Sequence, residues 1–147
     1  MQEHIQNELA SFIANCDWEK IAPHFKEDAA YRVLDWIGCA VAGEHYPQVE
    51  IAQKYFIENG DQGNSTVIGH QTKCSPRTAA FLNGIAGHVC ELDDGHRTAI
   101  GHPGSIAVPT ALALGEHLNA SGADVLKAVI LGYEVFSRLG RTVNPSH

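Results

Sequence analysis

The sequence predicts an all-α domain, a helical bundle-like fold with one short extended or β connection near residues 65–69. Two observations support this class: apolar residues recur at helical spacing in nearly every segment, and Ser, Pro and Gly stand where helices begin and end. A third observation is that the signal of a β-strand, β-branched residues with turn residues on both sides, occurs only at the triplet Thr66-Val67-Ile68. With 147 residues and 44% hydrophobic content, the chain is long enough for one domain with a buried core.

The first three helices follow from apolar stripes and the residues that interrupt them. Residues 4–16 carry apolar side chains at i, i+4, i+7 and i+8, the spacing of an amphipathic helix. Residues 26–42 are largely apolar and are expected to stop at Gly43, because a helix commonly closes on a residue that tolerates a left-handed backbone. Pro47 can open a third helix that ends near residues 59–60. Small residues in the second helix indicate that another helix approaches closely: Gly38, Cys39, Ala40 and Ala42.

The second half of the chain has clear helix start signals. Ser75 and Pro76 supply a capping hydroxyl and a proline at the first helical position. This helix is expected to continue to about Leu92. A loop over residues 94–101 follows, and Pro103 opens the next helix.

The last two helices complete the prediction. Pro109 lies about two turns inside the helix that Pro103 opens, so it should kink that helix or move its start to about residue 108. Ser121 and Asp124 form a capping-box pattern for a final helix that runs through Leu139. Internal repeats and low-complexity linkers are not evident, which favours one domain.

The composition narrows the range of partners and compartments. Ten Lys and Arg stand against 17 Asp and Glu, the formal charge is −7, and the scattered cations form no basic stripe for a nucleic acid. No apolar run approaches the roughly 18–20 residues of a membrane span, so we expect a soluble protein without membrane contact. The four cysteines are widely spaced, without a CxxC pair or a secretion leader, which favours reduced thiols and a cytoplasmic location. They are Cys16, Cys39, Cys74 and Cys90.

Titratable residues gather in one stretch, "HVCELDDGHRTAIGHPGS", at residues 88–105. If the preceding helix continues to Leu92, His88 and Glu91 share one face, and Asp93 and Asp94 lie at its C-terminal end. The helix dipole disfavours carboxylates there by roughly several tenths of a kcal/mol each. Carboxylates at an unfavourable end of a helix are expected where they serve a function, so we expect a functional site here.

His102 lies directly before Pro103, next to the start of an apolar helix. The free N–H groups of a helix start attract anions, so a charged histidine there can bind a substrate carboxylate. A histidine can also move a proton near neutral pH. The alternative is that His102 only caps the helix.

Residues 75–116, "SPRTAAFLNGIAGHVCELDDGHRTAIGHPGSIAVPTALALGE", resemble the signature region of the MmgE/PrpD family. An Ala pair, Asn-Gly, a His, an acidic residue, an Asp pair and His-Pro-Gly occur in the family's order. The similarity extends to "YRVLDWIGCAVAG" at 31–43, "STVIGHQTKCSP" at 65–76 and "GYEVFSRLGRTVNPSH" at 132–147.

The resemblance implies a helical domain that forms one wall of an active site, in enzymes that need neither a metal nor an organic cofactor. It places Glu91 near a catalytic acidic position, and it matches Asp93 and Asp94 to the family's Asp pair. It also matches His102 to the histidine of the His-Pro motif, and Thr98 to a substrate-contacting hydroxyl. Independently, Arg97 is a local cation that can hold developing negative charge.

The function implied is proton transfer α to a carboxylate of a small polycarboxylate, as in 2-methylcitrate dehydratase or cis-aconitate decarboxylase. Family members are longer and have a second, lid domain. Residues 1–147 are therefore expected to be the N-terminal portion of the helical domain, to be inactive alone and to form a homodimer. Dehydration, decarboxylation and epimerisation share a proton transfer, and these residues do not separate them.

Two other functions stay open. A metal-dependent helical hydrolase would use the stretch as a ligand set: His88, Asp93, Asp94, His96 and His102. Against it, adjacent Asp93 and Asp94 cannot both point inward from a regular helix. The other alternative is a helical interaction or dimerisation module, or a truncated non-catalytic homologue, with residues 38–43 and 122–141 as interface surfaces.

Overall fold

The computed structural model describes residues 2–71 and 73–144, with side chains from residue 4, so the last three residues of the segment 132–147 lie outside it. It confirms the all-α class. The elements in chain order are α1 (Gln2–Ala14), the 3₁₀ turn η1 (Trp18–Lys20), α2 (Pro23–Gly43), α3 (Pro47–Glu58), β1 (Ser65–Thr66), β2 (Lys73–Cys74), α4 (Pro76–His88), α5 (Gly104–Leu118) and α6 (Gly122–Val143). None of the described helices is long and apolar enough to cross a membrane.

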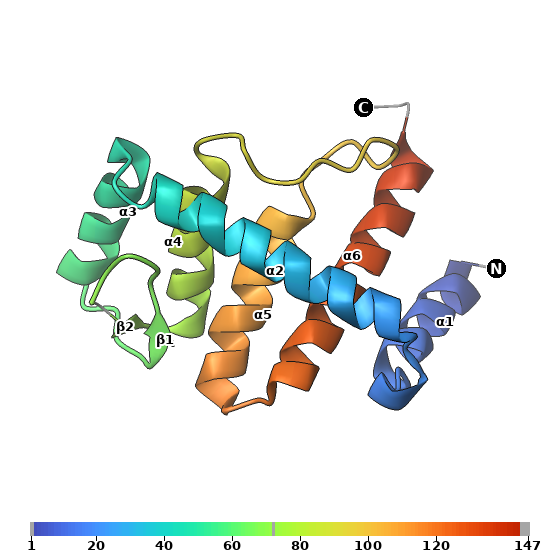
Figure 1. Cartoon of the computed structure of the whole chain (residues 1–147). Helices are drawn as coiled ribbons and strands as arrows, with labels where there is room; N and C mark the ends of the chain where they lie inside the picture. Colours follow the sequence, from blue (N-terminus) through green and yellow to red (C-terminus); the bar gives the residue numbers. More distant parts are fainter. Residues whose placement is uncertain (1, 72, 145–147) are drawn as a thin grey trace.

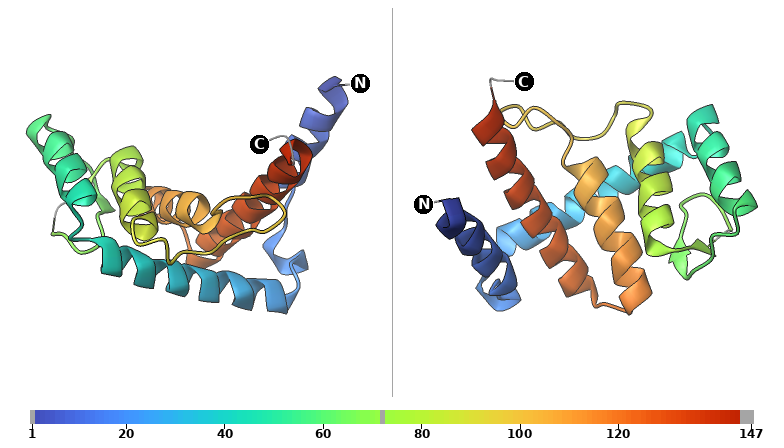
Figure 2. Two further views of the ribbon diagram at one scale, coloured as in Figure 1. Left: turned by 90° about the horizontal axis from the view of Figure 1, so that it is seen from above. Right: turned by 180° about the vertical axis from the view of Figure 1, so that it is seen from behind.

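Helix α2 lies across a layer in which α4, α5 and α6 run side by side (Figures 1 and 2). The main core forms between α2 and this layer around Trp36, which is 2% exposed. The other buried members of this core are Ala40, Val49, Ala86, Val108, Ala111 and Val129. Helix α1 projects from the far end of α2, away from the core (Figure 2, left).

The small residues of α2 do meet another helix, as predicted, but only some of them take part. Cys39 and Ala40 are buried, whereas Gly38 and Ala42 are exposed. The closest approach is at Gly43, where an added Cβ would collide with the carbonyl oxygen of Ala86 in α4. Residue 43 must therefore be glycine for α2 and α4 to pack this closely.

The extended connection is a two-stranded antiparallel sheet that pairs Ser65 with Cys74 and Thr66 with Lys73. The predicted connection over residues 65–69 contains the first strand, β1, whereas the second, β2, is not predicted. A strand of two residues is too short to show alternation, which explains the miss. The sheet is tied to α5 because the Ser65 hydroxyl donates to the carbonyl oxygen of Ala113 at 2.7 Å.

The starts predicted from Pro47, Pro76, Pro103 and Ser121 are confirmed, whereas the first two helices begin earlier than predicted, at Gln2 and Pro23. Ser75 caps α4, and the Ser121 hydroxyl accepts the Asp124 N–H of α6 at 3.2 Å. Helix α4, however, ends at His88 rather than Leu92, and Glu91 turns the chain in a left-handed conformation at φ +50°. Helix α5 begins at Gly104, directly after Pro103 as predicted, so the alternative start near residue 108 is wrong.

Pro109 lies inside α5 and does not interrupt it. A proline lacks the N–H that would bond to the carbonyl four residues earlier, here that of Ser105. That carbonyl oxygen lies 3.3 Å from the point where a Cβ on Gly84 would stand. Helix α5 therefore continues through Pro109. The Ser105 carbonyl, which lacks its helical partner, lies against Gly84, which has no side chain.

Candidate active site

The site is built on the loop of residues 89–103, which joins the end of α4 to the start of α5 and reaches the end of α6 (Figure 1). His96 organises the loop. Its N–H donates to the Gly101 carbonyl at 2.8 Å, its carbonyl accepts the Ile100 N–H at 2.8 Å, and its Nδ1 accepts the Ala99 N–H at 3.0 Å. His96 is therefore occupied in holding the loop.

Asp93 is the centre of the site, and its carboxylate is fully buried. His88 Nδ1 lies 3.0 Å from Oδ1 and 3.1 Å from Oδ2 of Asp93. The Ser105 hydroxyl donates to Oδ2 at 2.6 Å. His102 Nδ1 lies 3.3 Å from Oδ2, but its alignment makes no hydrogen bond. The imidazoles of His88 and His102 stand edge to face, with centroids 4.7 Å apart.

The buried carboxylate is linked to the protein core through Ser105. Trp36 Nε1 donates to Ser105 Oγ at 3.3 Å, so the core tryptophan of α2 supports the serine that holds Asp93. These contacts join α2, the end of α4, the loop and the first turn of α5. A buried carboxylate needs such partners, because an unpaired buried charge is strongly unfavourable.

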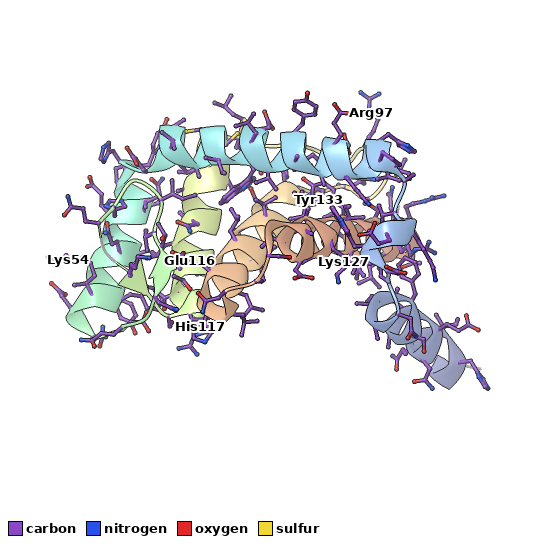
Figure 3. All side chains as sticks on the ribbon, turned by 60° about the horizontal axis from the view of Figure 1, so that its bottom comes forward. Lys54, Arg97, Glu116, His117, Lys127 and Tyr133 are labelled. Atoms are coloured by element: carbon purple, nitrogen blue, oxygen red, sulfur yellow. The ribbon has the colours of Figure 1, made fainter. Side chains whose placement is uncertain are left out.

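Asp94 points to the other side of the loop. Its Oδ1 accepts the Gly104 N–H at 2.9 Å, and its Oδ2 lies 3.5 Å from Arg32 Nη1 of α2. Burial, and then the nearby Asp94 carboxylate, raise the pKa of Tyr133, which lies between helices in Figure 3. Arg32 in turn stacks over the Tyr133 ring, 4.9 Å from its centroid. Asp94 therefore joins α2 and α6 to the start of α5.

The predicted position of the Asp pair at the unfavourable end of a helix is wrong. Helix α4 ends five residues before Asp93. Asp94 instead caps the N-terminus of α5 through Gly104, where the helix dipole favours a carboxylate. An added Cβ on Gly104 would come within 2.5 Å of Asp94 Oδ1, so this approach requires glycine.

A groove of about 740 Å³ opens beside the buried carboxylate. Its polar lining includes His88, His102 and Ser105. Apolar side chains form most of the remainder, among them Phe81, Ile85, Ile100, Ile106, Pro109 and Phe136. None of the described residues that line the groove is Lys or Arg. The groove therefore offers proton-transfer groups without a cation.

The other predicted site residues lie outside the groove lining. Glu91 is exposed on the loop. Arg97 is exposed and points away from the body of the molecule (Figure 3). Thr98 is exposed too, and its carbonyl accepts from Asn144 Nδ2 at 2.9 Å. Of the six predicted residues, the structure brings together Asp93 and His102.

His88 and Ser105 contact Asp93 and are not among the catalytic residues that the sequence predicts. The sequence offers His88 as a metal ligand and as a neighbour of Glu91 on one helix face. Its separation of five residues from Asp93 matches neither neighbour spacing of a helix, so no local pattern paired the two. The end of α4 at His88 brings them together.

The proposed metal ligand set is only partly assembled. Ligand atoms of His88, Asp93 and His102 lie within 4.8 Å of one another. Asp94 is bound to the start of α5, and His96 Nδ1 accepts a loop N–H. Asp93 Oδ2 already accepts from Ser105. The arrangement is that of a hydrogen-bonded carboxylate between two imidazoles. Of the five proposed metal ligands, three lie close enough together to bind one ion.

The fold and the cluster define a helical domain that presents two histidines and a buried carboxylate to a groove. The MmgE/PrpD N-terminal domain matches residues 7–147, and the chain belongs to this family, as its motifs predicted. It is 32% identical over 144 residues to a cis-aconitate decarboxylase of Aspergillus terreus, covering 95% of this chain and 29% of that protein.

Two further relatives carry similar names. The chain is 31% identical over 144 residues to a cis-aconitate decarboxylase-like protein of Aspergillus oryzae, covering 93% of this chain and 30% of that protein. It is 35% identical over 112 residues to a cis-aconitate decarboxylase of Homo sapiens, covering 73% of this chain and 23% of that protein. The chain thus spans less than a third of the length of these relatives.

Proposed function

We propose that this chain forms the N-terminal part of a lyase that acts on a small polycarboxylate, with cis-aconitate decarboxylation as the favoured reaction. The observation that carries the proposal is the cluster of His88, Asp93, His102 and Ser105 at one side of a groove. The names of the relatives favour decarboxylation over a 2-methylcitrate dehydratase-like reaction. The proposed chemistry requires no metal or organic cofactor.

The reaction needs a proton donor next to the carbon that gains hydrogen when carbon dioxide leaves. When the C–C bond to the leaving carboxylate breaks, its electron pair moves into the remaining unsaturated acid. An imidazolium then delivers a proton to carbon, and the ring becomes neutral. Two histidines on one groove wall are suited to this transfer.

We further propose that this chain is inactive alone. A tricarboxylate carries up to three negative charges, and Arg and Lys are the usual partners of carboxylates. The described groove lining contains neither. The cations would come from other parts of a protein as long as the relatives, or from the second subunit of a homodimer. We place the protein in the cytoplasm, because its four cysteines are unpaired.

The test compares the 147-residue chain with the full-length product of its gene. Each is given cis-aconitate or 2-methylcitrate in D₂O, and NMR follows loss of substrate, uptake of deuterium and release of carbon dioxide. We expect the full-length product to decarboxylate cis-aconitate and the 147-residue chain to do nothing. A folded full-length product that neither turns over nor exchanges protons in either acid would refute the proposal.

A role as an interaction module is the second candidate, and exposed apolar side chains favour it. Phe81 is 53% exposed, Ile106 60% and Leu118 63%, so α4 and α5 present apolar surface to solvent. Sedimentation velocity measures whether the chain pairs with itself. If the chain is monomeric and the full-length product lacks activity, both candidate functions are wrong.

A further inference from the structure

We propose that His88, rather than His102, carries the proton in this site, and that Asp93 and Ser105 are the residues that position it. This inference rests on the proposed function for the reaction, but its geometry stands without it. The two histidines face the same groove and the same carboxylate. Their contacts with that carboxylate differ, and the difference assigns their roles.

The first step is the asymmetry of the two imidazoles. His88 Nδ1 contacts both oxygens of Asp93, at 3.0 and 3.1 Å, in hydrogen-bond geometry. His102 Nδ1 lies 3.3 Å from one oxygen, is buried and has no hydrogen-bond partner among the described residues. Asp93 therefore orients one ring, that of His88.

The second step fixes which atom donates. Trp36 Nε1 donates to Ser105 Oγ, so the serine accepts from the indole and directs its own hydrogen to Asp93 Oδ2. With Ser105 donating, Asp93 acts as an acceptor, which is the role of an ionised carboxylate. The hydrogen between His88 and Asp93 then belongs to His88 Nδ1.

The third step concerns the opposite edge of the His88 ring. A neutral imidazole with its hydrogen on Nδ1 has its lone pair on Nε2. The His88 side chain is 46% exposed although its Nδ1 edge rests on a carboxylate that is fully buried. The exposed part of the ring is therefore the Nε2 edge, which faces the groove. A buried Asp that fixes the tautomer of a catalytic histidine is the logic of hydrolase triads.

His102 takes the other role. Its ring is 42% exposed and lines the groove, and it lies two residues before Gly104, the first residue of α5. Free helix N–H groups and the positive end of the dipole favour an anion there. His102 is therefore suited to hold a substrate carboxylate while His88 exchanges the proton.

The proton balance of the step is simple. His88 begins as imidazolium, with Nδ1–H on Asp93 and Nε2–H toward the substrate. The C–C bond to the leaving carboxylate breaks, carbon dioxide departs, and the electron pair takes the Nε2 proton to form a new C–H bond. His88 is left neutral and regains a proton from water.

Two measurements test the roles. In the 147-residue chain, ¹⁵N NMR of labelled histidines reports the tautomer without any need for turnover. We expect the hydrogen of neutral His88 on Nδ1, and we expect Asp93→Asn and the milder Ser105→Ala to shift that tautomer toward Nε2. A wild-type chain with the His88 hydrogen on Nε2 overturns the assignment.

In the full-length product, kinetics separate the two histidines. We expect His88→Gln to lower kcat about 10²–10⁴-fold with little change in KM, and His102→Gln to act mainly by raising KM. His117→Gln is the matched control, because that ring bonds Asn64 at 2.8 Å away from the groove. Loss of kcat in His102→Gln, with His88→Gln within about threefold of wild type, would overturn the proposal. If the full-length product turns over neither acid but the tautomer of His88 is as expected, the proposed reaction is wrong. The orientation of His88 by Asp93 is then still supported.

Discussion

Replacing Gly87 by alanine should disturb the contact that supports the site. Gly87 lies in α4 against the indole of Trp36, and an added Cβ would come within 2.6 Å of Cε2 and 2.8 Å of Cζ2. Trp36 is 2% exposed, so it has no free space into which to move. Its indole N–H also donates to Ser105, and a displaced ring would weaken that hydrogen bond.

The magnitude follows from a matched control. An extra methyl group in a packed core costs about 1–3 kcal/mol, and alanine in a helix gains roughly 0.5–1 kcal/mol over glycine. Gly38 is an exposed position inside α2 with no atom within 4 Å of an added Cβ, so Gly38→Ala receives the helix gain alone. The two variants should therefore differ in unfolding free energy by about 1–3 kcal/mol.

Urea unfolding followed by circular dichroism measures this difference. With a slope of roughly 1–3 kcal/mol per molar urea, the midpoint of Gly87→Ala should lie on the order of 1 M below that of Gly38→Ala. Unchanged slopes would show that the native packing, and not the unfolded state, carries the effect. If the two variants unfold at the same concentration, α2 and α4 do not meet at Trp36 as described.

Three further predictions concern other parts of the molecule. Burial raises the pKa of the Cys39 and Cys74 thiols, so iodoacetamide should label the other two cysteines first, as mass spectrometry of timed samples will show; equal labelling contradicts their burial. The pKa of Glu116 is lowered because, although desolvation raises it, hydrogen bonds from Lys73 and Thr66 outweigh that effect. The stabilisation is therefore present above the ordinary glutamate pKa of about 4.3 and is lost as pH falls through the lowered pKa of the folded state. Glu116→Gln should destabilise the chain more at pH 7 than at pH 3, and equal losses at both values would contradict this. Metal analysis of the purified chain should find no stoichiometric zinc, iron or manganese; a full equivalent would favour the hydrolase alternative.

Local sequence signals determined most of the helical structure. Proline at the first turn set the starts of α3 and α4, and the hydroxyls of Ser75 and Ser121 cap their helices as predicted. These signals act within about four residues, so they are readable without a fold. The family motifs likewise located the loop that carries the site.

The end of α4 and the direction of each Asp were decided by the tertiary structure. The sequence places Asp93 and Asp94 side by side, yet one faces two imidazoles and the other faces Gly104 and Arg32. Which carboxylate enters the site depends on how α2 and α5 meet the loop.

Trp36 and Ser105 are separated by 69 positions, and their hydrogen bond exists only because α2 crosses the start of α5. The pairing of His88 with Asp93 is closer along the chain, and it forms because α4 ends at His88 and a left-handed turn at Glu91 folds the chain back. Helix starts depend on neighbours along the chain, so the sequence by itself determined them. The link from the buried carboxylate through Ser105 to Trp36 depends on packing between distant helices, and so only the tertiary structure decided it.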